Sequence, residues 1–187
     1  MTSYVILLRG INVGGKNKMP MAALKQFLEE LGFTNVRTYI QSGNVLLESN
    51  LSREQITEAI EKMLPIKFKL DSSIIKVLVL SHDDLQAVID KAPKGFGAEP
   101  DKYHSDAIFL MGITSKDAMP VFAPRDGVDR IWPGEGVIYS QRLSAERVKS
   151  RLNKIVGTLP YKSMTIRNWN TTTKLLKILE EREAKEI

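Results

Sequence analysis

Apolar and polar residues follow two patterns along the first half of the chain. Apolar runs of about four to eight residues are typical of buried strands, whereas apolar residues repeated about every three to four positions indicate a helix. These patterns predict helices beginning near residue 20 and at residue 52, and strands at 4–8, 36–40, 45–48 and 74–80. The predicted order is strand, helix, strand, strand, helix, strand, which is the order of the ferredoxin-like split βαβ fold.

Capping and turn residues mark the ends of these elements. Pro20 suits the first turn of a helix, where its missing N–H would have no partner. Ser52 and Gln55 have the spacing of a capping box, and Pro65 predicts the end of the second helix. The sequence Gln-Ser-Gly-Asn at 41–44 is typical of a hairpin turn and predicts that the second and third strands are paired.

The second half of the chain repeats this order and adds a helix. Its pattern predicts strands at 107–111, 128–132, 137–140 and 164–167, and helices at 85–91, 115–119, 145–156 and from residue 170. We therefore predict an α+β protein with two ferredoxin-like (βαββαβ) halves and an added C-terminal helix. The predicted limits are 1–92 for the N-terminal subdomain, 93–104 for a linker and 105–187 for the C-terminal subdomain. A single continuous sheet is the alternative, because only the element order suggests a repeat.

Composition narrows the possible chemistry. The 187 residues are 43% hydrophobic and 26% charged, which is ordinary for a globular protein. The chain has no cysteine, so disulfides, thiolate metal sites, iron–sulfur clusters and cysteine nucleophiles are excluded. It has two histidines, His82 and His104, so a histidine-rich zinc centre is excluded as well. We expect neither a metal nor a cofactor.

The apolar runs also bear on cellular location. The run Val5–Leu8 is shorter than the roughly 7–15 apolar residues of a secretory signal. No run approaches the roughly 18 apolar residues of a membrane-spanning helix. We therefore expect a cytoplasmic protein without a membrane partner. The sequence gives no indication of an oligomeric state.

Basic residues are concentrated in two segments. The chain carries 27 Lys and Arg against 22 Asp and Glu, a net charge of +5. Residues 1–28 contain four basic residues and no acidic one, and residues 142–177 contain nine basic residues against Glu146. If the two segments meet in space, they form one surface that attracts anions.

The loop after the first strand is rich in glycine and resembles the start of a P-loop. Residues 10–16 match the pattern GxxxxGK, in which backbone N–H groups and a lysine surround a phosphate. However, Asn17 stands where Ser or Thr would bind Mg²⁺, and Pro20 delays the helix start. The loop is therefore either a looser anion-binding loop or a tight turn whose glycines supply positive φ. The candidate ligand-binding residues here are Arg9, Asn12, Gly14, Gly15 and Lys16.

Two further segments contain candidate binding residues. In the predicted hairpin turn, Ser42 and Asn44 either line a pocket with the glycine loop or only stabilise the turn. At the last strand–helix junction, Arg167, Asn168 and Trp169 offer a guanidinium, an amide and an indole to an anion or a base. The alternative for Trp169 is that it covers the core, and Asn170 is the predicted helix N-cap.

The acid–base residues do not form a recognisable catalytic motif. His82, Asp83 and Asp84 lie where a helix begins, which is typical of capping. His104 is adjacent to Ser105 and Asp106, but Ser–His–Asp chemistry needs contact in space rather than adjacency in sequence. The sequence therefore leaves the catalytic residues unknown, and whether the protein is an enzyme stays open.

Three segments together indicate a family resemblance: residues 8–16, 41–45 and 165–171. The sequence resembles a family of uncharacterised bacterial proteins, filed as a domain of unknown function. Its members open with Leu-Arg-Gly-Ile-Asn-Val-Gly-Gly and carry Arg-Asn-Trp before the last helix. The resemblance covers nearly the whole chain and implies an α+β fold with ferredoxin-like elements, without an established function. Many relatives carry Ser-Lys-Leu where this chain has 150-Ser-Arg-Leu-152, which retains the charge.

Three functions compete at this point. The favoured one is binding of a phosphorylated or anionic ligand, which means nucleic acid or a phosphorylated small molecule. An enzyme acting on a small anionic metabolite and an interaction protein without catalytic activity are the alternatives. The binding hypothesis expects Arg9, Lys16, Asn44 and Arg167 to converge on one cleft.

Overall fold

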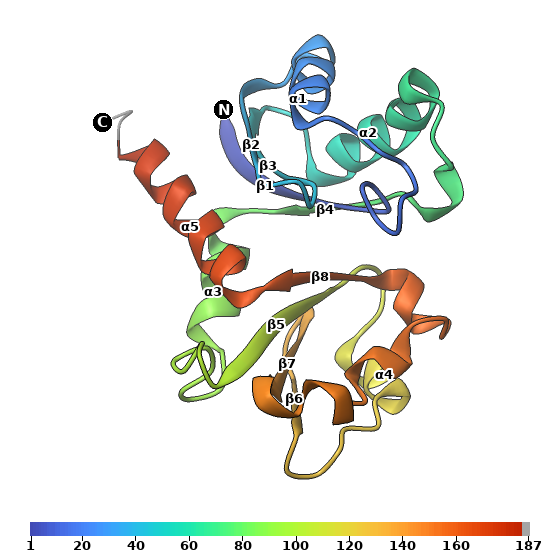
Figure 1. Cartoon of the computed structure of the whole chain (residues 1–187). Coiled ribbons are helices and arrows are strands. Elements are labelled where there is room, and N and C mark those ends of the chain that lie inside the picture. The colour runs from blue at the N-terminus through green and yellow to red at the C-terminus, as the bar shows by residue number, and fades with distance from the viewer. Residues whose placement is uncertain (185–187) are drawn as a thin grey trace. The chain divides into compact units, whose positions relative to one another are not determined.

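The computed structural model describes residues 1–184 and forms two compact units (Figure 1). Unit 1 contains residues 1–85 together with the described residues from 175 onward, and unit 2 contains residues 86–174. Within the described residues, no helix is both long and apolar enough to cross a membrane. The domain limits expected from the sequence stay a prediction.

Unit 1 has the split βαβ order that the sequence predicts. Its sheet has the strand order β2-β3-β1-β4, and all neighbours are antiparallel. Strands β1 and β2 are therefore parallel to each other, with β3 between them, as in ferredoxin-like folds. The elements are β1 (Thr2–Arg9), α1 (Met21–Glu30), β2 (Thr34–Tyr39), β3 (Asn44–Ser49), α2 (Arg53–Phe68), η1 (Ser72–Ile74) and β4 (Lys76–Leu80).

The core of unit 1 lies between one face of this sheet and the two helices that connect its strands. Alternate strand residues point to this face, and apolar residues of α1 and α2 pack against them. The central members of the core are Ile6, Leu8, Leu24, Phe27, Val45, Ile56 and Ile60. The predicted capping box is confirmed, because Ser52 Oγ accepts from the Gln55 N–H and the Gln55 side chain accepts from the Ser52 N–H.

The predicted end of α2 at Pro65 is wrong, because the helix continues to Phe68. A proline lacks an N–H and crowds the preceding turn, but its carbonyl can still accept hydrogen bonds from the residues that follow. The carbonyl of Pro65 accepts from the backbone N–H groups of Lys69 and Leu70. The helix then ends at Lys69, which adopts the left-handed conformation with φ of 52°.

Unit 2 repeats the same topology in a second four-stranded antiparallel sheet, with the order β6-β7-β5-β8. The α+β class with two ferredoxin-like halves and a C-terminal helix is therefore confirmed, and the alternative of one continuous sheet is wrong. Its elements are β5 (Tyr103–Leu110), α4 (Ser115–Ala118), η2 (Met119–Val121), β6 (Asp129–Pro133), β7 (Val137–Leu143), η3 (Ser144–Lys149), η4 (Leu152–Ile155), η5 (Pro160–Ser163) and β8 (Met164–Asn168). Two helices, α3 (His82–Asp90) and α5 (Trp169–Glu183), each have residues in both units.

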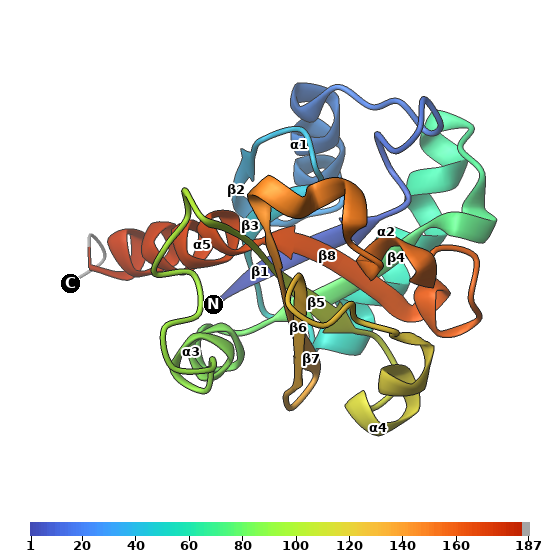
Figure 2. The same ribbon diagram turned by 60° about the horizontal axis from the view of Figure 1, so that its bottom comes forward.

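The predicted helix at 145–156 is wrong. Three short 3₁₀ turns, η3 to η5, connect β7 to β8, and we call residues 144–163 the crossover segment (Figure 2). The backbone N–H of Arg151 donates to the Asp129 carboxylate at 2.8 Å instead of to a carbonyl one turn earlier. Val148, which an amphipathic helix would bury, is 93% exposed. The hydrogen bond from Arg151 to Asp129, 22 positions earlier in the sequence, therefore takes the place of the bond that a regular helix would need.

Candidate functional site

The glycine loop of unit 1 is a tight two-residue turn. The Lys16 N–H donates to the Val13 carbonyl at 2.9 Å, and Gly14 and Gly15 have φ values of 55° and 77°. Positive φ at both central residues is the geometry of a type I′ hairpin turn. The tip is exposed, and the Lys16 N–H is already used inside the turn. This geometry fits the tight-turn alternative, and anion binding by Gly14, Gly15 and Lys16 stays a prediction.

Two asparagine side chains connect this loop to its neighbours. The Asn12 amide donates to the carbonyls of Met19 at 2.9 Å and Gln41 at 3.1 Å, and so brings the glycine loop beside the hairpin turn. The Asn17 amide donates to the carbonyls of Gly10 at 2.8 Å and Asp71 at 3.2 Å. Both asparagines have positive φ, which Asn tolerates better than most residues.

The other candidates of unit 1 also hold backbone groups in place. Asn44 is fully buried, and its amide donates to the Tyr39 carbonyl at 3.1 Å and to Ser42 Oγ at 2.9 Å. Arg9 Nη1 donates to the Ile74 carbonyl at 3.1 Å. The structure thus brings the glycine loop and the hairpin turn together, with the amides of Asn12 and Asn44 engaged in the turns. Ligand binding by these residues stays a prediction.

The last strand–helix junction belongs to unit 2. Arg167 is 6% exposed, and its Nη1 donates to Thr165 Oγ1 and to the Ile166 carbonyl, both at 2.9 Å. Burial lowers the pKa of its guanidinium to about 10. Asn168, rather than the predicted Asn170, caps α5, because Asn168 Oδ1 accepts from the Asn170 N–H at 2.9 Å.

Trp169 lies in an aromatic cluster rather than on the surface. It is 8% exposed, and its ring meets those of Phe96 and Tyr139 edge-on at centroid distances of 4.9 and 6.2 Å. Gly97 allows this packing, because a Cβ there would lie 2.0 Å from Trp169 Cδ1. This placement matches the alternative that Trp169 covers the core. The candidates from the two ends of the chain lie in different units, so their convergence on one cleft stays a prediction.

The pairing register of unit 2 gathers polar residues at one end of a sheet face. Residues directly opposite each other on antiparallel strands point to the same face. His104 pairs with Arg142, and Arg142 also pairs with Asp129. Asp106 pairs with Ser140 and Asn168. Farther along the same strands the face is apolar and carries the core residues Ile108, Ile138 and Met164.

Asp129 organises three arginines at this polar end. Its side chain is 6% exposed, and Oδ2 accepts from the backbone N–H groups of Arg125 at 2.9 Å and Arg151 at 2.8 Å. Arg142 is its partner on the neighbouring strand. The carboxylate therefore fixes the backbone at Arg125 and Arg151, and strand pairing places Arg142 opposite Asp129. We call Arg125, Arg142 and Arg151 the arginine cluster.

The side chains of the arginine cluster lack acceptors. All three are partly buried, and the structure of residues 1–184 contains no hydrogen bond or ion pair from any of the three guanidinium groups. The Nε atom of each is buried without a hydrogen-bond partner, and so is Asp129 Oδ1. Buried donors without acceptors are costly, and native structures contain few of them. The arginine cluster is thus suited to an added anion.

The negative charge of Asp129 does not balance the positive charges of the arginine cluster. Burial tends to raise the pKa of Asp129, but hydrogen bonds from the Arg151 and Arg125 N–H groups and from Ser150, together with the charge of Arg142, lower it overall. The carboxylate therefore remains ionised at neutral pH. Asp129 and Asp106, whose carboxyl also interacts with the charge of Arg142, are together fewer than the three guanidinium groups.

His104 and Asp106 form a dyad beside Arg142. His104 Nε2 lies 2.9 Å from Asp106 Oδ2, and His104 lines a small cavity of about 60 Å³ together with Asn168 and Trp169. Such a pair can accept and return a proton. Ser105 faces the other side of the strand, where its Oγ accepts from Gln141 Nε2 at 3.0 Å. A Ser–His–Asp arrangement of these three neighbours is therefore ruled out by geometry.

We expect Asp106 to reduce stability as the pH rises. Burial raises the pKa of its carboxyl, opposed by the charges of His104 and Arg142. The folded state therefore binds this proton more tightly than the unfolded state, and that advantage is lost as pH rises above the usual value of 3.8. Urea unfolding of Asp106→Asn and wild type at pH 4 and pH 7 should show the variant gaining relative stability at the higher pH. An unchanged or reversed difference would contradict this assignment.

Within residues 1–184, no group of three or more His, Asp or Glu side chains is arranged to hold a metal ion. The functional groups gathered in unit 2 are the guanidinium groups of the arginine cluster, the His104–Asp106 dyad and backbone amides.

Comparison with known proteins gives a family and a structural relative. The model of a family described as "Protein of unknown function (DUF1697)" matches residues 1–139. The chain is also similar to a solved structure, the conserved bacterial protein SP0830 from Streptococcus pneumoniae, at 31% sequence identity and a TM-score of 0.75. That similarity covers 95% of this chain and 98% of the other. Among curated proteins, none matches.

Proposed function

The chain belongs to the DUF1697 family of proteins of unknown function, and we propose that it binds a phosphate-bearing ligand, most simply nucleic acid, at the arginine cluster. The observation that carries this proposal is the three partly buried guanidinium groups, whose Nε atoms have no acceptor. We place this activity in the cytoplasm, as the sequence predicts.

The chemistry of arginine favours a phosphate over other anions. A guanidinium presents several N–H donors in a rigid planar fork that matches two phosphate oxygens at once. Asp129 fixes the backbone of Arg125 and Arg151, so only the side chains remain to be ordered when the anion arrives. Preorganised donors bind more tightly because less conformational entropy is lost.

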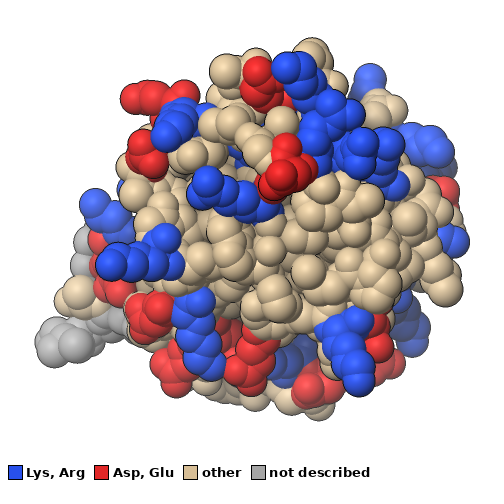
Figure 3. Space-filling model, turned by 90° about the horizontal axis from the view of Figure 1, so that it is seen from below, with Lys and Arg blue, Asp and Glu red and all other residues tan. Residues whose placement is uncertain are grey.

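The surroundings of the cluster favour a polymer over a single phosphate. The crossover segment adds exposed basic residues, and only Glu146, paired with Lys149 at 2.7 Å, opposes them there. On the face shown in Figure 3, Lys and Arg side chains gather at the upper right, next to a broad area without charged side chains. A row of cations follows successive phosphates of a nucleic acid. The exposed basic residues of this segment are Arg147, Lys149, Lys154 and Lys162.

A salt titration of oligonucleotide binding tests the proposal. Fluorescence anisotropy with labelled single-stranded RNA and DNA should show affinity falling linearly on a log–log plot between about 50 and 200 mM salt. Replacing one phosphate-binding arginine, as in Arg142→Gln, should weaken binding roughly tenfold for all sequences and lower the salt slope by about 1.

The matched control is Arg130→Gln. Arg130 is exposed on the neighbouring strand β6, on the opposite face from Asp129, and lies over the Tyr103 ring at 5.5 Å. The Arg130→Gln variant should leave the affinity for the oligonucleotide nearly unchanged. No binding at the lowest salt, or equal losses in the two variants, would refute the arginine cluster as the site. Equal inhibition by inorganic pyrophosphate would assign the site to a phosphorylated small molecule.

A further inference from the structure

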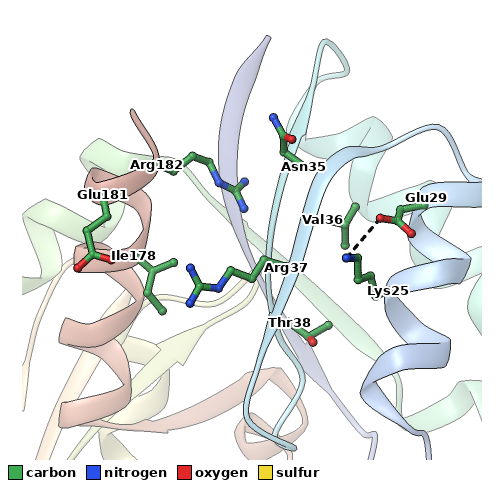
Figure 4. Close-up of a pocket in the computed structure, with 9 residues that line it drawn as sticks. All are labelled: Lys25, Glu29, Asn35, Val36, Arg37, Thr38, Ile178, Glu181 and Arg182. Carbon is green, nitrogen blue, oxygen red and sulfur yellow. Dashed lines mark ion pairs between the residues drawn. The ribbon is translucent and has the colours of Figure 1, made fainter. Parts of the chain in front are cut away.

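A groove in unit 1 follows the outer edge of β2. Strand β2 is the end strand of its sheet and pairs with β3 only, so alternate backbone groups face outward. The groove has a volume of about 700 Å³, within the usual range of ligand sites. Residues from α1, β2 and the last turns of α5 line it (Figure 4).

A β-bulge decides which side chains enter the groove. Thr34 pairs with Glu48 but Arg37 pairs with Leu46, so β2 contains one extra residue at Asn35, where φ is 49°. Bulges change the side to which the following side chains point. Val36 therefore joins the apolar core under α1, whereas Arg37 shares the opposite face with Leu46 and Glu48.

Buried contacts hold the bulge and one wall of the groove. Asn35 Nδ2 donates to Glu48 Oε2 at 2.7 Å, and Glu48 is 6% exposed. From α5, Arg182 Nη1 approaches Glu48 Oε1 at 3.9 Å. Because a buried carboxylate is costly without cations and donors around it, this arrangement fixes both the bulge and Arg182.

Two guanidinium groups approach the groove from opposite walls. Figure 4 shows Arg37 reaching from β2 toward α5, and Arg182 reaching from α5 toward the strands. The Arg37 side chain is exposed and has no hydrogen bond or ion pair within residues 1–184. On the α1 side, Lys25 is already paired with Glu29 at 3.7 Å. Glu181 of α5 lines the groove as well, so the cation open to a ligand is Arg37 itself, on the face of β2 toward α5.

We propose that this groove binds an extended acidic peptide segment of a partner protein, which adds a strand to the outer edge of β2. In such pairing, backbone hydrogen bonds supply affinity and alternate side chains supply specificity. Alternate residues of an added strand face α1 and α5 in turn. Acidic residues then meet Arg37 on the α5 side, while apolar residues cover the α1 side near Val36. This interaction is separate from the arginine cluster, which belongs to unit 2.

The test uses a labelled six-residue peptide that alternates glutamate and valine, with the full-length protein. Anisotropy should show saturable binding, and Arg37→Gln should weaken it roughly tenfold, as expected for one charge-assisted contact. Lys62→Gln, an exposed change on α2 outside the groove, should have no effect. Hydrogen exchange of the β2 amides should slow when the peptide is bound.

Control peptides separate charge from backbone pairing. A peptide that alternates glutamine and valine should bind the wild-type protein about as weakly as the acidic peptide binds the Arg37→Gln variant. N-methylation of alternate amides of the acidic peptide should abolish its binding. The proposal is overturned if the acidic peptide does not bind, if Arg37→Gln or N-methylation leaves its affinity unchanged, or if the glutamine peptide binds equally well. Oligonucleotide binding that depends on Arg37 in place of peptide binding would also overturn it.

Discussion

Replacing Gly10 with alanine is expected to destabilise unit 1 by about 3 kcal/mol or more, a loss typical of a forced backbone rearrangement. A Cβ at Gly10 would lie 2.1 Å from the carbonyl oxygen of Ile74, and backbone atoms cannot move aside as a flexible side chain can. The φ of +86° adds the strain of a left-handed conformation. Urea unfolding followed by circular dichroism measures this loss.

Gly14→Ala is the matched control in the same loop. Its φ of +55° is also left-handed, but a Cβ there meets nothing within 4 Å. We expect a loss of about 1 kcal/mol from conformation alone. If the two alanine variants were equally stable, close packing against Ile74 would not explain the glycine at position 10.

Replacing Asp129 with alanine should have the second largest effect, a loss of about 3 kcal/mol. The N–H groups of Arg125 and Arg151 would lose a charged acceptor, and hydrogen bonds to charged groups contribute about 1.5–3 kcal/mol each. Because the folded-state pKa of Asp129 is lowered, its stabilisation is present above the usual value of 3.8 and is lost as pH falls below that value. Urea unfolding at pH 7 and at pH 3 measures both effects.

Asp129→Asn separates the acceptor from the charge. Its amide oxygen can still accept from a backbone N–H, so we expect a loss of only about 1 kcal/mol. In oligonucleotide binding, the alanine variant should be weaker than the asparagine variant, because the backbone beside Arg125 and Arg151 is then no longer fixed. Equal stability of both variants would show that hydrogen bonding by Asp129 does not hold this region.

The sequence predicts the fold because the fold follows from local patterns. Short apolar runs locate the strands, the capping box at Ser52 locates α2, and residues 41–44 locate the hairpin between β2 and β3. These signals depend on neighbours a few positions away. The order of elements then leaves few topologies, since connections between consecutive elements are short and have a fixed hand.

The sequence predictions fail where contacts between residues far apart in the sequence determine the local structure. The predicted helix at 145–156 fails because Asp129, 22 positions before Arg151, takes its N–H. The same contact brings Arg151 to the arginine cluster, so no local motif could reveal that Arg151 belongs to it, whereas Arg125 lies only four positions before Asp129. The dyad was missed for another reason: β5 begins at Tyr103, not at the predicted residue 107. In a strand that includes residue 104, the spacing of His104 and Asp106 places both on one face.

The side-chain Nε–Hε resonances of arginine provide the most direct test of phosphate binding at the cluster. We would titrate ¹⁵N-labelled protein with a short single-stranded oligonucleotide at low salt and follow these signals by NMR. The account predicts that the signals of Arg125, Arg142 and Arg151 shift together and saturate, since their Nε atoms gain acceptors that they now lack. If those three signals stay in place while the amides of the glycine loop shift, the central claim is contradicted.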